Sequence, residues 1–460
     1  MLLGFVVGYL ILNLLAGLYA SRRVKKSDDF ILAGRKLPLL LATTTVFATW
    51  FGSETVMGAS AEMAEHGLRG VIEDPFGASL CLLLVGVFFA RKLYRMNLLT
   101  FGDFYKICFG RKAELFAGIS LVVSYIGWIA AQMVAMGLVI HTFLPEINIQ
   151  LAIIVSSLCV VGYTWLGGLW AVSITDFVQT VLIIVGLIIV LIIVSDAAGG
   201  IGHVIEQTPA SYFRFFPDND WTSWVGWFAA WITIGLGSIP QQDVFQRVMA
   251  SDSEKTAVRS SLIAAGMYLT VAMIPLLLAL CARQLIAAPG DSQLLLTELI
   301  RQKTGLWVQV LFFGALLSAI MSTASGALLA PSVILSENIV RPFLKIKNDR
   351  ALLRLTRFCI IIVACIALAM ALVRKDIYEL VGEASEISLV SLFVPLCAGL
   401  FLKSRNEKAA LVSMFSGFAG WIIARFFETE FPPMLIGTGA SLAGMILFSV
   451  LCRRSAASDN

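Results

Sequence analysis

The chain has 460 residues, a formal net charge of +4 and a mean hydropathy of +0.87; 58% of its residues are hydrophobic and only 14% are charged. Soluble domains carry about 25% charged residues, so the composition excludes an ordinary soluble protein and predicts an all-α polytopic membrane protein. The sequence contains no P-loop, GxSxG, HExxH or CxxC motif. We therefore expect a protein that is not an enzyme, and the small positive charge requires no nucleic-acid partner.

Thirteen segments are long and apolar enough to cross a bilayer, which takes about 20 apolar residues each. In chain order they are 1–20, 37–63, 72–92, 113–143, 149–167, 173–195, 221–246, 256–284, 304–341, 352–373, 377–402, 407–427 and 433–452. The first segment lacks a basic leader and a cleavage motif, so we expect a retained span and not a signal peptide.

The basic residues predict an orientation. Most of the 34 Lys and Arg residues fall in the loops after odd-numbered segments, and Arg247 is counted with the loop that follows the seventh. Basic loops stay in the cytoplasm, so the N-terminus is expected outside and the C-terminus in the cytoplasm, in a bacterial cytoplasmic (inner) membrane.

Two of the segments are interrupted. Gly52 weakens the second segment near Trp50–Ser53, and Gly235, Gly237 and Pro240 interrupt the seventh. Each feature alone is compatible with an ordinary kink, because Pro removes a backbone hydrogen bond. Their matching positions, five segments apart, instead indicate inverted repeats, whose broken helices line substrate and ion sites near the midplane.

The repeats define the expected organisation of a single transmembrane domain, residues 1–460. The first repeat covers 37–195 and the second covers 221–402. One helix at 1–20 precedes them, and the extra helices within 407–452 follow.

The ninth segment carries a cluster of small hydroxyl residues. Ala319, Ser322 and Thr323 stand at i, i+3 and i+4 and therefore share one helical face. Two hydroxyl oxygens one turn apart can hold a small hard cation if a second element supplies further oxygens. The spacing thus predicts a sodium site, and a sodium site indicates coupled transport. The alternative is that these side chains bond back to their own helix and ease packing.

The whole chain resembles the sodium:solute symporter family, on four motifs. They are FATWFGSETVMGAS at Phe47–Ser60, GGLWAVSITDFVQ at Gly167–Gln179, GSIPQQDVFQRV at Gly237–Val248 and MST at Met321–Thr323. The resemblance implies a LeuT-type fold of 5+5 inverted repeats, Na⁺ as the coupling ion, a lipid bilayer as surroundings and a small organic solute as cargo. Within the family, FATWFG is similar to the choline-transporter branch.

The resemblance also implies a ligand set for sodium. Ala48, Phe51 and Ala319 would contribute backbone carbonyls, and Ser322 and Thr323 would contribute hydroxyls. All five are neutral oxygens, which suits a monovalent ion, since Ca²⁺ takes several carboxylates. Some relatives hold a second sodium with the Asp of a TD motif and two further serines.

The second sodium site is incomplete in this sequence. Asp176 and Ser325 match two of its positions, whereas Gly326 occupies the remaining serine position and has no side-chain oxygen. One sodium per substrate is therefore predicted. Asp176 is alternatively a structural or gating carboxylate.

Candidate substrate residues lie at the first break and on facing helices: Trp50, Trp128, Gln132, Gln241 and Glu54. An indole face attracts an organic cation, and the glutamines offer hydrogen bonds to a polar solute. Two positions of the choline-type aromatic cage are Ala78 and Gln241 here, so that cage is incomplete. The alternative for both tryptophans is a packing role.

Acidic residues on the outer half are candidates for a gate or for cation attraction: Glu73, Asp74, Glu383 and Glu386. Ionisable groups within a membrane are costly and usually functional, although residues of a wet vestibule are the alternative. Their excess favours an amine-containing, zwitterionic or cationic solute. We therefore predict a sodium-coupled symporter, with a symporter of a neutral or anionic solute, such as a sugar or carboxylate, or a non-coupled channel or sensor on the same fold as alternatives.

Overall fold

The computed structural model describes residues 4–5, 8–9, 11, 15, 26–287, 290–402, 405–427 and 431–458, without the side chains of Tyr163 and of residues 452–458. Most of the predicted first segment, 1–20, lies outside the described residues. The described part is helical apart from short connections and an isolated bridge between Leu37 and Ser251.

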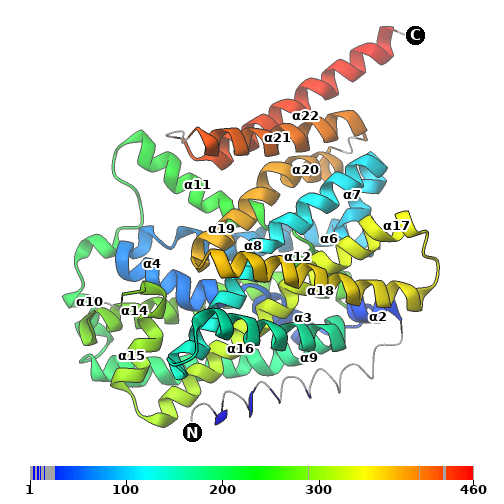
Figure 1. Ribbon diagram of the computed structural model, residues 1–460. Coiled ribbons are helices and arrows are strands. Elements are labelled where there is room, and N and C mark those ends of the chain that lie inside the picture. The colour runs from blue at the N-terminus through cyan, green and yellow to red at the C-terminus, as the bar shows by residue number, and fades with distance from the viewer. Residues whose placement is uncertain are drawn as a thin grey trace.

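The helices alternate between long spans and short segments (Figure 1). The longer helices are α3 (Leu39–Trp50), α8 (Arg111–Phe143), α9 (Ile149–Ala197), α11 (Trp221–Gly237), α13 (Glu254–Val271), α14 (Met273–Leu285), α16 (Leu306–Ile334), α18 (Asp349–Val373), α19 (Ile377–Ser388), α21 (Glu407–Phe426) and α22 (Pro433–Ser458). The shorter ones are α2 (Ser27–Leu32), α4 (Ala59–His66), α5 (Ala78–Leu84), α6 (Ala90–Met96), α7 (Phe101–Phe109), α10 (Ile201–Gln207), α12 (Gln242–Ala250), α15 (Leu295–Lys303), α17 (Arg341–Leu344) and α20 (Val394–Phe401). Wider π-helical turns are η2 (Glu54–Gly58), η4 (Ile72–Gly77), η5 (Val85–Phe89), η8 (Leu335–Val340) and η9 (Leu389–Phe393).

Nine helices of the described part are long and apolar enough to cross a membrane, compared with thirteen predicted segments. The difference has physical causes. The second and seventh segments are broken, so each half is too short by itself. The fifth reaches only Ile149–Gly162 as an apolar stretch and continues into the sixth through a bend at Gly168, whose φ is +56°. The first segment, 1–20, lies mostly outside the described residues.

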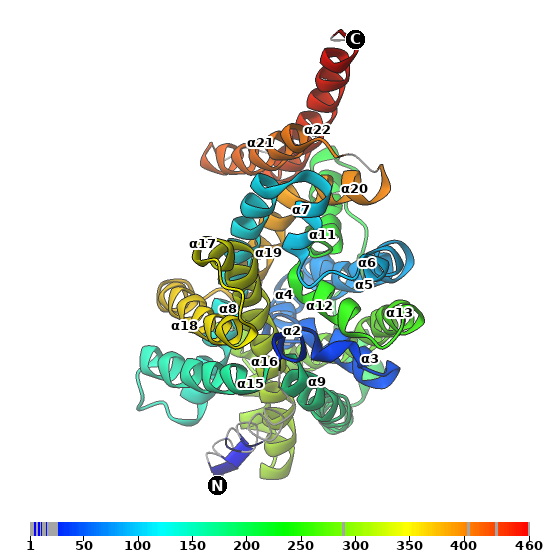
Figure 2. The same ribbon diagram turned by 90° about the vertical axis from the view of Figure 1, so that its right-hand side faces the viewer.

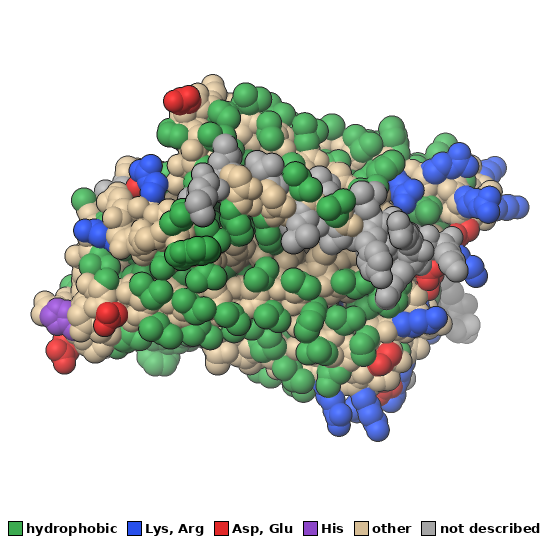
Figure 3. Space-filling view, turned by 90° about the horizontal axis from the view of Figure 1, so that it is seen from below, with side chains coloured by type: hydrophobic (Ala, Val, Ile, Leu, Met, Phe, Trp, Pro, Cys, Tyr) green, Lys and Arg blue, Asp and Glu red, His purple; other side chains and the backbone are tan. Residues whose placement is uncertain are grey.

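Large apolar side chains cover the outer surface between two polar ends (Figure 3). Examples are Leu158 at 66% exposed, Ile192 at 62% and Phe415 at 65%. Soluble monomers rarely expose apolar surface so continuously, so this band is the surface that faces lipid. Lys and Arg side chains gather at one end of the band in this view.

The centre of the molecule is built around α16. Every residue from Phe312 to Ile334 on this helix is buried, as expected for a helix that is apolar on all sides. Helices α8 and α9 pack along it, and the two ribbon views agree that α21 and α22 lie at the periphery (Figures 1 and 2). Small hydroxyl residues on α16 therefore face protein and not lipid.

Both predicted helix breaks are confirmed. Helix α3 ends at Trp50 and the chain becomes helical again at Glu54, while α11 ends at Gly237 and α12 begins at Gln242. A Cβ added at Gly52 would lie 2.7 Å from Thr323 Oγ1 and 2.7 Å from Glu54 Oε2. Glycine at the first break thus allows the backbone to approach α16 closely.

Candidate functional site

The first break frees a backbone carbonyl that points at α16. The Gly52 N–H bonds to the Trp50 carbonyl at 2.8 Å, so it does not make the helical bond to Ala48. The Ala48 carbonyl oxygen instead lies 3.1 Å from Ser322 Oγ and 3.3 Å from Thr323 Oγ1. The two hydroxyls predicted to bind sodium therefore meet one predicted carbonyl ligand across the two helices.

Asp176 joins the same cluster from α9. Its side chain is fully buried, and its Oδ1 lies 2.5 Å from Ser322 Oγ. The Ser322 proton can serve either the Ala48 carbonyl or this carboxylate, and Thr323 can donate to the Ala48 carbonyl in its place. The cluster thus gathers a carboxylate, a carbonyl and two hydroxyl oxygens, which are oxygen types that bind a hard cation. Asp176 was predicted as a second-site ligand or a gate, and the structure places it directly behind Ser322.

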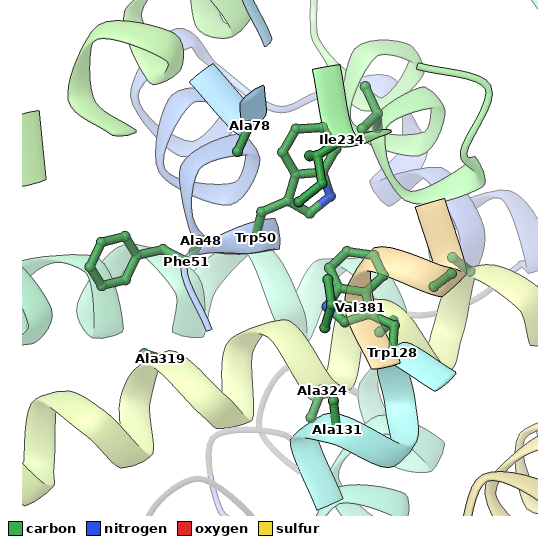
Figure 4. Close-up of a cluster of buried hydrophobic side chains, with 14 of the residues drawn as sticks. Ala48, Trp50, Phe51, Ala78, Trp128, Ala131, Ile234, Ala319, Ala324 and Val381 are labelled. Atoms are coloured by element: carbon green, nitrogen blue, oxygen red, sulfur yellow. The ribbon is translucent and has the colours of Figure 1, made fainter. Parts of the chain in front are cut away.

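The other two predicted sodium ligands lie nearby. Phe51 has a non-helical backbone at the break, with φ −74° and ψ 77°, so its carbonyl is turned out of the α3 helix. Figure 4 places Ala319 on the α16 ribbon that faces Ala48 and Phe51. The helix break and the small-residue face of α16 together supply oxygens of the type expected for a monovalent ion.

A small, partly open cavity lies beside the break, with a volume of about 20 Å³, which is room for about one water molecule. Its lining comes from both repeats: Trp50, Glu54, Asp74, Ala78, Trp128, Ile234, Ser238, Gln241, Tyr268, Val381, Ala384 and Ser385. The described lining contains two carboxylates and no Lys or Arg. Figure 4 shows the Trp50 ring beside Ile234 and the Trp128 ring beside Val381. Four predicted substrate residues, Trp50, Glu54, Trp128 and Gln241, thus share one cavity.

Glu54 is held in place by two donors from α8. Trp128 Nε1 donates to Oε1 at 3.0 Å, and Gln132 Nε2 donates to Oε2 at 2.7 Å. Gln132, predicted to touch substrate, does not line the cavity. Its Oε1 accepts the Ser53 N–H at 3.2 Å, so it connects the break to α8.

Asp74 lines this cavity and not the outer surface, where it was predicted to act as a gate. Thr55 Oγ1 donates to its Oδ2 at 2.6 Å and Tyr268 OH donates to its Oδ1 at 2.7 Å. Tyr268 OH also lies 3.0 Å from the Trp50 carbonyl. This second carboxylate is therefore fixed to the break by neutral donors only.

Trp50 is fixed by a partner from the second break. Its Nε1 donates to Asp243 Oδ2 at 2.9 Å, and Tyr125 OH donates to Asp243 Oδ1. Asp243 is fully buried. The indole therefore stands with its edge bonded to α12 while its face remains available to the cavity.

The remaining predicted acidic residues line a separate outer recess together with Tyr378 and Arg425. Glu383 forms ion pairs with Arg374 and Arg425, and Glu386 Oε2 accepts Trp421 Nε1 at 2.7 Å. Glu73 also faces this recess. Arg69, the basic residue close to Glu73 in the chain, pairs instead with Asp218 at 2.8 Å. These residues line a recess that is separate from the inner cavity.

Sequence reasoning missed three buried polar residues. Tyr268 is a lone tyrosine in an apolar helix, and Asp243 follows the break two residues after Gln241; both positions are visible signals in the sequence. The assignment of Arg247 to a cytoplasmic loop was wrong. It lies on α12, only 1% exposed, because this helix is buried along its whole length against α3 and α16.

Broken helices beside a cavity are typical of secondary transporters, in which freed backbone groups line the ion and solute sites. The model of the sodium:solute symporter family matches residues 30–417, and the chain belongs to this family. It is a sodium-coupled symporter of a small solute in the lipid bilayer, and it is not an enzyme.

Individual relatives differ in their cargo. The chain is 27% identical to the human high affinity choline transporter 1 over 90% of this chain and 75% of the relative. It is 28% identical to the high-affinity proline transporter of Bacillus subtilis over 95% of both chains. It is 30% identical to a sodium/sialic acid symporter of Proteus mirabilis over 58% of this chain and 55% of the relative.

Solved structures confirm the LeuT-type fold. A Na⁺-coupled sialic acid symporter in its substrate-bound outward-open state superposes with a TM-score of 0.84 at 24% identity, over 98% of both chains. Mhp1, a nucleobase-cation-symport-1 family transporter in a closed conformation, gives a TM-score of 0.64 at 14% identity, over 92% of this chain and 95% of that one.

Proposed function

We propose that this symporter couples the inward flow of one sodium ion to the uptake of a small organic solute that carries an amine, either a cation or a zwitterion. The observation that carries the proposal is the pair of buried carboxylates, Glu54 and Asp74, in a cavity walled by two indoles. Burying a charge is costly unless it is paired, and the side chains that bond to both carboxylates are neutral donors.

An amine supplies what this cavity lacks. Its positive charge would compensate the carboxylates, and its alkyl portion would lie against the faces of Trp50 and Trp128, where a desolvated cation–π contact contributes about 2 kcal/mol. A carboxylate anion alone would be repelled by both acids. A sugar would find few free hydrogen-bonding groups, because Ser238 bonds to Ser385, Gln241 to Ser388 outside the lining, and Tyr268 to Asp74.

For sodium we propose Ala48, Phe51 and Ala319 as carbonyl ligands and Ser322 and Thr323 as hydroxyl ligands. The approach of both hydroxyls to the Ala48 carbonyl supports this assignment. Sodium bound there would bridge the α3 break to α16. It would therefore stabilise the wall that carries Trp50, which couples sodium binding to the solute cavity.

We also propose an orientation, with the N-terminus outside and the C-terminus in the cytoplasm of a bacterial cytoplasmic membrane. The gathering of Lys and Arg at one end of the apolar band supports it (Figure 3). The match over 95% of both chains to a Bacillus subtilis transporter supports the bacterial assignment.

The driving force is adequate for accumulation. One sodium ion moving through 100 mV contributes about 2.3 kcal/mol, and a tenfold sodium gradient contributes about 1.4 kcal/mol more. Together these values would concentrate a net-neutral solute on the order of several hundred-fold.

The test is uptake into proteoliposomes of radiolabelled amines, amino acids, sugars and carboxylates under a sodium gradient, with potassium replacing sodium as the control. The proposal expects accumulation of an amine only with sodium. Glu54→Gln and Asp74→Asn should each abolish or strongly weaken that uptake, whereas Glu65→Gln removes an exposed carboxylate of the neighbouring helix α4 and should not.

Accumulation of a sugar or a carboxylate anion with no amine uptake would refute the amine assignment. Equilibration without accumulation, equal in sodium and potassium, would instead indicate a channel.

A further inference from the structure

A cavity lined by basic residues lies apart from the ion and solute sites. It is bordered by α6, α7 and the end of α20, and its volume of about 360 Å³ is within the range of ligand pockets. These three helices lie near one another in both ribbon views (Figures 1 and 2). Within the described part of the chain, no residue that lines this cavity also lines the inner cavity.

Three cations line this basic cavity: Lys92 and Arg95 on α6, and Arg405 in the connection before α21. Its described lining contains no Asp or Glu. Arg95 pairs with Glu254, outside the lining, at 2.8 Å, whereas Lys92 and Arg405 form no ion pair with any of the described residues. The cavity therefore carries net positive charge and is complementary to an anion.

An aromatic ring positions one of these cations. Lys92 Nζ lies 3.9 Å from the centroid of the Phe401 ring, and Phe401 packs edge-on against Phe89 with ring centroids 5.2 Å apart. A cation over an aromatic face is attracted to the ring, while its other N–H groups stay available to an acceptor. Membrane orientation requires basic residues in this loop, but it does not require them to surround a hollow.

The basic cavity continues into the apolar surface that faces lipid. Ile107 lines the cavity and is 55% exposed, and Val87 and Phe88 on η5, immediately before α6, are exposed as well. At the end of α20, Phe401 and Leu402 also expose apolar side chains. A soluble anion would use only the cations, whereas a ligand with acyl chains contacts both the cations and these apolar side chains. The combination favours a lipid.

We propose that the basic cavity binds the phosphate headgroup of an anionic phospholipid, with Lys92 and Arg405 as its cationic partners and the acyl chains beside Ile107 and Phe88. Basic pockets between membrane helices bind anionic headgroups in this way. Helices α6 and α7 belong to the first predicted repeat and α20 to the second, so the lipid bridges the two and stabilises their arrangement. With the proposed orientation, this lipid belongs to the cytoplasmic leaflet.

The test titrates the purified protein in a neutral detergent with phosphatidylglycerol. Native mass spectrometry measures the lipid retained, and the unfolding temperature measures the stabilisation. Phosphatidylglycerol should be retained and should raise the unfolding temperature, whereas phosphatidylcholine and inorganic phosphate at the same concentrations should not. Lys92→Gln/Arg405→Gln should weaken phosphatidylglycerol binding about thirtyfold, from about fivefold for each cation removed.

The matched control is Lys255→Gln/Arg350→Gln, which removes two exposed cations of α13 and α18 outside the cavity. This control should bind phosphatidylglycerol like the wild type, and an equal loss in both variants would refute the site by showing unspecific charge attraction. Equal retention of phosphatidylcholine would overturn the inference, as would wild-type affinity of the cavity variant. Equal stabilisation by inorganic phosphate would show a site for a soluble anion instead.

A second measurement applies if the cavity variant is not recovered folded. Photoactivatable phosphatidylglycerol is then crosslinked to the wild type, and the labelled peptides are identified. Labels on α6, α7 or the end of α20 support the inference, and labels confined to other helices contradict it. Neither measurement uses an organic solute or a sodium gradient, so the outcome is independent of the amine assignment.

Discussion

The sodium cluster can be tested by removing its two hydroxyls. In Ser322→Ala/Thr323→Ala, the Ala48 carbonyl loses both side chains that approach it from α16, and Asp176 loses its 2.5 Å neighbour. The backbone carbonyls at the break remain. The double variant therefore removes two of the five proposed ligands while leaving the helices themselves intact.

The magnitude follows from the removal of two hydroxyl ligands. Hydrogen bonds to a charged group contribute about 1.5–3 kcal/mol each. If each hydroxyl contributes the same amount to sodium binding, the loss of both hydroxyls weakens sodium binding by roughly 3–6 kcal/mol. At 1.4 kcal/mol per factor of ten, this corresponds to about 10²–10⁴-fold in affinity. The unpaired Ala48 carbonyl adds a cost of about 1–3 kcal/mol to folding, which predicts a lower unfolding temperature as well.

The assay is the sodium concentration that gives half-maximal uptake, together with the stabilisation of the purified protein by sodium relative to potassium. Ser332→Ala is a matched control, because Ser332 is buried on the same helix but donates its hydroxyl only to its own helix, to Leu328 at 2.7 Å. Wild-type sodium affinity in the folded double variant would refute the site.

Three further outcomes are expected. Trp50→Ala should weaken amine binding about thirtyfold, through loss of roughly 2 kcal/mol of cation–π attraction. Trp50→Phe should keep part of the affinity but destabilise the protein, because Asp243 loses a hydrogen-bond donor. Unchanged affinity of Trp50→Ala in competition binding would show that Trp50 only packs. Glu54→Gln should lower amine affinity about 10–150-fold, from roughly 1.5–3 kcal/mol, and an equal loss for a neutral analogue would show that its charge is not what matters. Glu73→Gln/Glu386→Gln should slow amine association in stopped-flow measurements at low salt. The difference from the wild type should vanish at about 1 M salt, where charges are screened. An effect that does not depend on salt would contradict electrostatic attraction of the amine.

The two breaks and the hydroxyl face of α16 were predictable because their causes are local. Gly52 and Pro240 interrupt helices wherever those helices pack, and Ser322 and Thr323 share a face by the helical period alone. The sequence also placed Trp50 near the sodium residues, because Ala48 and Phe51 are its neighbours in the chain.

The partners of these residues were not predictable from one sequence. Trp50 and Asp243 are separated by 193 positions, and only the packing of α3 against α12 brings them together. Arg247 was misassigned for a related reason: a short polar helix after a break resembles a cytoplasmic loop in composition. Asp74 was expected outside because its segment begins there, but the wide turn of η4 directs it inward.

The hydrogen bond between Trp50 and Asp243 has a consequence for inhibitors. Immobilising a flexible side chain on binding costs about 0.5–1.5 kcal/mol, but this indole is already immobilised by Asp243, which Tyr125 holds in turn. A ligand that stacks on the Trp50 ring therefore causes little further loss of side-chain freedom in the protein. Rigid cyclic amines should profit most, because neither partner then loses conformational freedom, and a compound series of increasing stiffness should gain affinity mainly through slower dissociation.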